Sequence, residues 1–158
     1  MSTNNYIQMM IDSLNKKRSI LESIVELNIR QDEILSTEEL DREAFDKNLT
    51  DKGDLIDEIL KLDEGFQSLY NRVKSELEEN KANYVSEIEV MKILISEVTE
   101  LGAKIEVQES RNKVKVEDMF RRERRETSTA KRSASMAKSY YQSMNKLNFE
   151  PQFMDTKQ

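Results

Sequence analysis

Carboxylates are the side chains of this sequence that come closest to acid–base chemistry. The chain of 158 residues carries 31 Asp and Glu, and groups at helical spacing such as Asp54, Asp57 and Glu58 are frequent. Two carboxylates act as an acid and a base only where burial moves their pKa values apart. These carboxylates belong to strongly charged stretches, which are typical of solvent-exposed helix faces. The sequence therefore predicts no catalytic residue, and we expect that the protein is not an enzyme.

Histidine and cysteine, the common ligands of protein-bound metals, are both absent from the chain. The di-iron sites of helical bundles need a Glu-x-x-His motif on facing helices, so that class of protein is excluded. The sequence also contains no glycine-rich loop of the kind that holds nucleotide phosphates. We therefore expect neither a metal nor a cofactor.

A basic stretch offers a different binding chemistry. Residues 121–138 hold seven basic and two acidic residues, and the Arg-rich neck at residues 121–132 could attract phosphates. Glu is interleaved in the neck, however, no aromatic platform accompanies it, and the whole chain has a net charge of −6. We expect a solvated helix end rather than a nucleic-acid site. Binding of nucleic acid or of an anionic membrane through this stretch is the alternative.

Long amphipathic helices must position all of these side chains. Two series of residues follow steps of four and three, which keep side chains on one stripe of an α-helix. One series is Phe45, Leu49, Lys52, Ile56, Ile59, Asp63, Phe66, Tyr70, Val73 and Leu77, and the other is Tyr84, Ile88, Met91, Ile95, Val98, Gly102, Ile105, Glu109, Asn112, Val116 and Met119. A further apolar stripe follows Thr3. With 35% charged residues, three Gly and one Pro, the composition suits long helices that each bury one stripe.

We therefore predict an all-α fold, an elongated antiparallel bundle or coiled coil of three long helices with a C-terminal helical or flexible arm. Breaks are expected at residues 36–39, where Ser and Thr precede Glu as in a capping box, and at residues 78–83. Residues 1–125 would form the bundle. Residues 126–158 would form the arm, either within the same domain or as a flexible tail.

Polar residues interrupt both of these series, which we call the seams. Lys52 and Asp63 are interpreted as devices that fix the alignment of neighbouring helices, at some cost in stability. Glu109 and Asn112 replace apolar residues at consecutive seam positions, and the apolar stripe resumes at Val116. These two residues predict that the third helix overhangs a shorter neighbour there and leaves an apolar stripe for a partner.

The C-terminal arm is the strongest candidate for a binding site. Methionines and tyrosines return there after a stretch of Ser, Thr and Ala, and such side chains suit a surface that accepts irregular apolar shapes. On a helix, Ala134, Ala137, Tyr141 and Met144 share one face, with Tyr140 at its border and Leu147 one step further on. The predicted partner-binding residues are Met136, Tyr140, Tyr141, Met144, Leu147, Phe149 and Phe153. The alternative is that the arm packs on its own bundle, and both states can hold in turn.

Three strings in the sequence resemble flagellar export chaperones of the FlgN type. They are Phe45…Leu49-x-x-Lys52-x-x-Leu55-Ile56-x-x-Ile59…Leu62, then Ile105-x-x-x-Glu109-x-x-Asn112, and the ending Phe153-x-Asp155-x-Lys157. The related FliT type shares the architecture. The resemblance implies a small helical chaperone that holds hook–filament junction proteins, or the filament cap protein for the FliT type, and delivers them to the export apparatus. The Arg-rich neck has no counterpart in the family pattern.

The resemblance implies a cytoplasmic protein with protein partners, present as a monomer or a homodimer. We expect no insertion into a membrane, because no stretch approaches the roughly 20 apolar residues that a span needs. No signal peptide is visible at the start of the sequence. A structural coiled-coil protein that self-associates through the same seam is the alternative in a different functional class.

Overall fold

Four α-helices make up most of the computed structural model, which describes residues 2–123 and 127–147. They are α1 (Thr3–Leu35), α2 (Arg42–Glu79), α3 (Val85–Arg122) and α4 (Ser128–Met144), and a short 3-10 helix, η1 (Lys81–Tyr84), joins α2 to α3. No strand occurs in this part of the chain. The predicted all-α class is confirmed.

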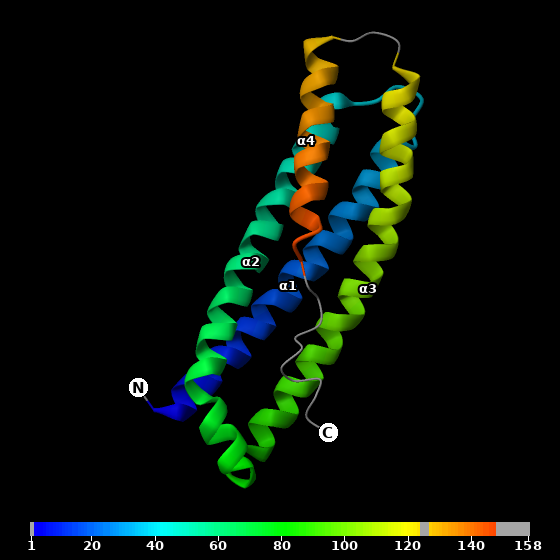
Figure 1. The fold of residues 1–158 in the computed structure, drawn as a ribbon. Helices are drawn as coiled ribbons and strands as arrows, with labels where there is room; N and C mark the ends of the chain where they lie inside the picture. The colour runs from blue at the N-terminus through cyan, green and yellow to red at the C-terminus, as the bar shows by residue number, and fades with distance from the viewer. Residues whose placement is uncertain (1, 124–126, 148–158) are drawn as a thin grey trace.

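The helices lie along one long axis and run alternately up and down (Figure 1). α1 packs lengthwise against both α2 and α3, whereas α4 packs mainly on α2 and runs in the same direction as that helix. The described part of the predicted arm is therefore a fourth helix of the bundle. None of the helices in the described ranges is both long enough and apolar enough to cross a membrane.

Polar side chains cap the N-termini of α1, α2 and α4. Asp41 starts α2 by accepting a hydrogen bond from the backbone N–H of Ala44 at 3.0 Å. The break at residues 36–39 is confirmed, but the cap itself was expected at Ser36 or Thr37. Thr37 instead donates its hydroxyl to the carbonyl of Ile34, close to the end of α1, so it closes the first helix and does not open the second.

The two predicted seams form the core of the bundle. In α2 every seam residue is buried except Asp63, and in α3 the seam is buried from Met91 to Val116. Asp63 is half-buried and accepts a hydrogen bond from Lys17 of α1, with the two charged atoms 2.7 Å apart. This pair lies between two apolar clusters, one near the α2–α3 hairpin and one around the upper half of α1. An ion pair near the middle of α1 therefore separates the two apolar clusters.

Candidate functional site

A layer of buried polar side chains crosses the bundle where all four helices meet. Lys52 of α2 is 0% exposed, and its Nζ lies 2.8 Å from Oε1 of Glu109 on α3. The same ammonium group donates to Asn28 Oδ1 at 2.8 Å and to Gln31 Oε1 at 3.0 Å, both on α1. Tyr140 of α4 donates its hydroxyl to Glu109 Oε2, and its ring centre lies 4.2 Å from Lys52 Nζ. We call these five residues the polar layer.

The prediction that α3 overhangs a shorter neighbour at Glu109 and Asn112 is wrong. Both residues are buried, and the Asn112 side-chain amide donates to the Asn28 carbonyl at 3.0 Å and to Gln31 at 3.1 Å. Buried charged and polar groups are tolerated when they are paired and hydrogen-bonded, as these are. The missed signal was the opposite charge of Lys52 and Glu109, each at a seam position of a different helix.

Burial governs the ionisation of the polar layer. It lowers the pKa of Lys52, and the charge and hydrogen bond of Glu109 oppose that change. It raises the pKa of Tyr140, and the negative charge of Glu109 raises it further. The pKa of Tyr141 is raised by burial first and then by the charges of Glu109 and Glu117. Both phenols therefore stay protonated, and Tyr140 acts as a donor to Glu109.

α4 meets the bundle through a face of small residues and one tyrosine, namely Ala130, Ser133, Ala137 and Tyr140. Ser133 donates its hydroxyl to Asp46 Oδ1 of α2 at 2.7 Å. The predicted face contained Ala134 and Tyr141, but Ala134 is exposed and Tyr141 is half-buried. The helix is rotated from the predicted setting because Tyr140, and not Tyr141, reaches Glu109.

The predicted partner-binding residues do not all share one environment. Tyr140 is only 4% exposed, so no partner can reach it while α4 is packed in this way. Four of them are half-buried along the edges of α4 and the residues just after it, namely Met136, Tyr141, Met144 and Leu147. Phe149 and Phe153 lie outside the described residues. Met136 lines a crevice of about 310 Å³ on the α2 side of α4, away from the other three half-buried residues.

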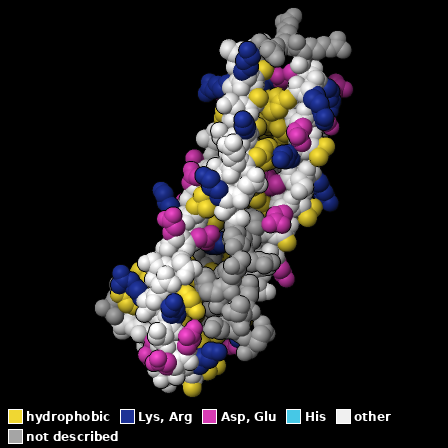
Figure 2. All heavy atoms as spheres, in the orientation of Figure 1, with side chains coloured by type: hydrophobic (Ala, Val, Ile, Leu, Met, Phe, Trp, Pro, Cys, Tyr) yellow, Lys and Arg dark blue, Asp and Glu magenta, His cyan; other side chains and the backbone are white. Residues whose placement is uncertain are grey.

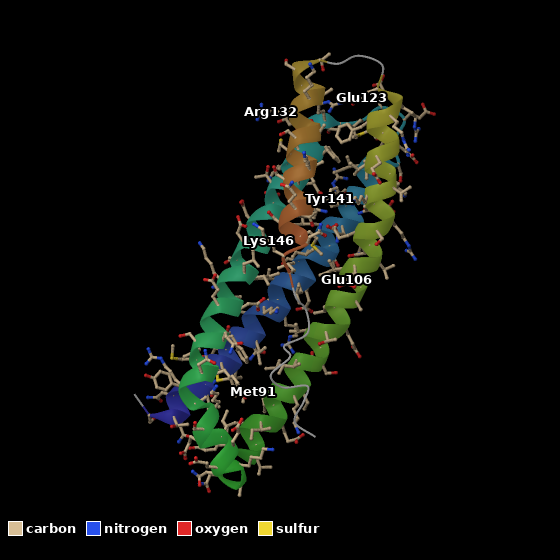
Figure 3. All side chains as sticks on the ribbon, in the orientation of Figure 1. Met91, Glu106, Glu123, Arg132, Tyr141 and Lys146 are labelled. Carbon is tan, nitrogen blue, oxygen red and sulfur yellow. The ribbon has the colours of Figure 1, made fainter. Side chains whose placement is uncertain are left out.

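An opening of about 400 Å³ separates the C-terminal part of α4 from α3. We call it the α3–α4 groove, and its main lining residues are Glu106, Ser110, Lys113, Tyr141, Met144 and Leu147. In Figure 3 the labelled Tyr141 and Glu106 mark its two sides. Figure 2 shows hydrophobic side chains gathered between α4 and the upper part of α3, with charged side chains on the rims. The groove is lined by Tyr141, Met144 and Leu147 together with polar and charged side chains of α3, and more of its exposed surface is polar than apolar.

Tyr141 is the residue of the groove with the most distinctive contacts. Its ring forms an edge-to-face pair with Tyr140 at 5.3 Å, and Lys113 Nζ lies 5.3 Å from the ring centre. Its hydroxyl is buried and has no hydrogen-bond partner within the described residues. A buried hydroxyl without a partner is costly, so a movement of Tyr141 that exposed this hydroxyl to a ligand able to accept its hydrogen bond would add affinity.

Other candidate chemistries have weaker structural support. Within residues 2–123 and 127–147 no three acidic side chains cluster in a way that could hold a metal ion. In the Arg-rich neck, Arg121 pairs with Asp118, and the nearby Glu123 pairs with Arg42 of α2. The described part of the neck is therefore partly neutralised by acidic neighbours.

No family model, curated protein or solved structure matches this chain. The function must therefore be inferred from the sequence pattern and from the geometry of the bundle.

Proposed function

We propose that this protein is a cytoplasmic chaperone of flagellar type III secretion, of the FlgN type, which shields a terminal helix of a hook–filament junction protein before export. The observation that carries the proposal is the half-buried row of Tyr141, Met144 and Leu147, which faces α3 across an open groove. Amphipathic helices bind such grooves through apolar anchors at intervals of three and four residues. The groove thus offers the kind of surface that would keep a helix of another protein from aggregating.

The chemistry of the groove suits a reversible complex. Full burial of one large apolar side chain contributes about 1.5–3 kcal/mol, so covering the exposed parts of three half-buried side chains contributes only a few kcal/mol. A micromolar complex needs about 8 kcal/mol. The partner must therefore also use the hydroxyl of Tyr141, the charges of Glu106 and Lys113, or further surface along α4. Such a complex can be released at the export apparatus without a nucleotide.

Recognition of the filament cap protein, as in the FliT type, would use the same groove. Because the FlgN and FliT types share one architecture, the proposal includes both the hook–filament junction proteins and the filament cap protein as cargo. A structural protein that only self-associates would have no use for a groove lined by the half-buried row of Tyr141, Met144 and Leu147.

Co-purification with candidate cargo tests the proposal. The variant Tyr141→Ala/Leu147→Asp should lose a junction or cap protein that the wild type retains, because an anchor and a hydroxyl are removed and a charge is placed at the end of the groove. Gln142→Asp is the matched control, since Gln142 is an exposed residue of α4. Both variants should unfold cooperatively near the wild-type temperature. Retention of the cargo by the double variant would count against the groove as the site.

A further inference from the structure

Exposed apolar side chains gather on α3. Among the described residues, large apolar side chains that are exposed occur at Val85, Val90, Ile93, Val107 and Val114 of α3, at 42–58% exposure. α2 has the same length of 38 residues and has no such side chain. The two remaining examples lie on α1. This difference between the two helices indicates that the exposed side of α3 is an interaction surface and not only a solvated helix face.

Four of these residues belong to a second stripe with steps of four and three, separate from the buried seam of α3. We call it the outer stripe, and it consists of Val90, Ile93, Glu97, Glu100, Lys104, Val107, Arg111 and Val114. All of these residues are exposed or half-buried, so the outer stripe faces away from the core. A stripe with this spacing is the geometry by which one helix packs along another.

The charges of the outer stripe are divided between its two halves. The acidic Glu97 and Glu100 precede Gly102, and the basic Lys104 and Arg111 follow it. Glu97 pairs with Arg18 of α1 at 2.9 Å. Glu100, Lys104 and Arg111 form no salt bridge or side-chain hydrogen bond within the described part of the chain. At equal distances from Gly102 the stripe therefore has an acidic residue, Glu100, on one side and a basic residue, Lys104, on the other.

We propose that the outer stripe binds the same stripe of a second copy of this chain, antiparallel, with the two-fold axis beside Gly102. In that arrangement Glu100 lies opposite Lys104 of the second copy and Val90 opposite Val114, because the members of each pair are equally far from Gly102. By the same count Glu97 lies opposite Val107 and Ile93 opposite Arg111, so the central Glu100–Lys104 pairs and the terminal valines carry the complementarity. A parallel pair would instead set each charge against its own copy, which is unfavourable. Closed two-fold symmetry is the commonest form of self-association.

The dimer goes beyond the proposed chaperone function and does not depend on it. Glu106 and Lys113, which line the α3–α4 groove, are not part of the outer stripe. Both grooves of the dimer therefore remain open to cargo.

Charge reversal tests the dimer directly. Sedimentation over a range of concentrations should show a monomer–dimer equilibrium for the wild type. Glu100→Lys or Lys104→Glu alone places like charges opposite each other at two symmetry-related points, and each should weaken the dimer about tenfold. The combination Glu100→Lys/Lys104→Glu restores the opposite pairing and should restore the affinity. Glu58→Lys, at an exposed position of α2, makes the same change in charge as Glu100→Lys and should have no effect. A wild type that stays monomeric, or a dimer that the single reversals leave intact, would overturn the proposal.

Cross-linking tests the direction of the pair, since the chain contains no cysteine. Val90→Cys and Val114→Cys chains that carry tags of different size are mixed and oxidised. The antiparallel dimer predicts a mixed disulfide between the two variants and little disulfide within either one. Efficient cross-linking of each variant to itself, without the mixed product, would show a parallel pair and overturn the proposal.

Discussion

Lys52 and Glu109 have opposite charges on α2 and α3, which both pack on α1, and the bundle buries both residues. Removing two charges from water costs several kcal/mol each, and their attraction with their hydrogen bonds offsets that cost only in good geometry. Such a pair adds little net stability compared with apolar residues of the same size. Its physical effect is on alignment, because any sliding of α2 along α3 leaves both charges buried without a partner.

The first prediction concerns that pair. Lys52→Met should lower the free energy of unfolding by about 3 kcal/mol, because Glu109 stays buried without its cation. The double variant Lys52→Met/Glu109→Leu should recover most of the loss. Urea unfolding followed by circular dichroism measures both values, and Lys61→Met at an exposed position of α2 is the control. A double variant as unstable as the single one would contradict the interpretation of the pair.

The second prediction concerns the pH dependence of the Tyr140 contact. The pKa of Tyr140 in the fold is raised above its unfolded value of about 10, so its contribution is fully present below that pH and declines as the pH rises beyond it. Tyr140→Phe should cost about 1–2 kcal/mol near neutral pH, because Glu109 loses a donor. Urea unfolding of both proteins should show this difference unchanged up to about pH 9 and smaller above about pH 10. A difference that is independent of pH would contradict the buried hydrogen bond.

The helices differ in how strongly the bundle holds them. α1, α2 and α3 bury long seams of mostly apolar residues, whereas α4 has 17 residues and buries two alanines, a serine and a tyrosine. Small side chains bury little apolar area, so α4 gains less from packing than the other helices do. Its N-terminus is instead defined by Thr127, whose side chain accepts a hydrogen bond from the backbone N–H of Ala130 at 3.1 Å.

The third prediction compares two helix caps. Thr127→Ala should cost about 1 kcal/mol, and this loss should be confined to α4, because the other helices pack without it. Asp41→Ala removes the equivalent cap of α2 and should lower the stability of the whole bundle by a similar amount. Amide hydrogen exchange measures both effects. Equal loss of protection in all four helices of the Thr127→Ala variant would contradict the view that α4 opens independently.

The sequence predicted the long helices better than it predicted α4. In α2 and α3 large apolar residues recur at seam spacing, so Phe45, Ile56 and Ile105 all lie in the core as expected. In α4 Ser and Ala give no such signal, and the choice between Tyr140 and Tyr141 depends on Glu109, which is distant in sequence. The polar layer was missed for the same reason. The polar residues of each seam can be identified from the sequence. That they contact one another across the bundle is seen only in the packed structure.

At the scale of the whole molecule, the bundle presents two different surfaces along α3. The α3–α4 groove has both polar and apolar lining residues, including Tyr141, whose hydroxyl has no hydrogen-bond partner within the described residues. The outer stripe has exposed apolar side chains, and in the proposed dimer its Glu100 would lie opposite Lys104 of the second copy. The all-α class and the core followed from helical periodicity. The groove could not be predicted in detail, because its shape depends on how α4 rotates on α2 and on how far α4 lies from α3.

Titration of a purified hook–filament junction protein into the wild-type protein, followed by calorimetry and amide hydrogen exchange, tests the proposed cargo site most directly. If cargo binds in the α3–α4 groove, calorimetry should show one cargo molecule per chain. Hydrogen exchange should then show new protection of backbone amides in α3 around residues 106–113 and at the end of α4 around residues 141–147. α2 residues that face away from α4, such as Lys61, should exchange as before. Absence of binding, or protection that avoids the α3–α4 groove, would contradict the account.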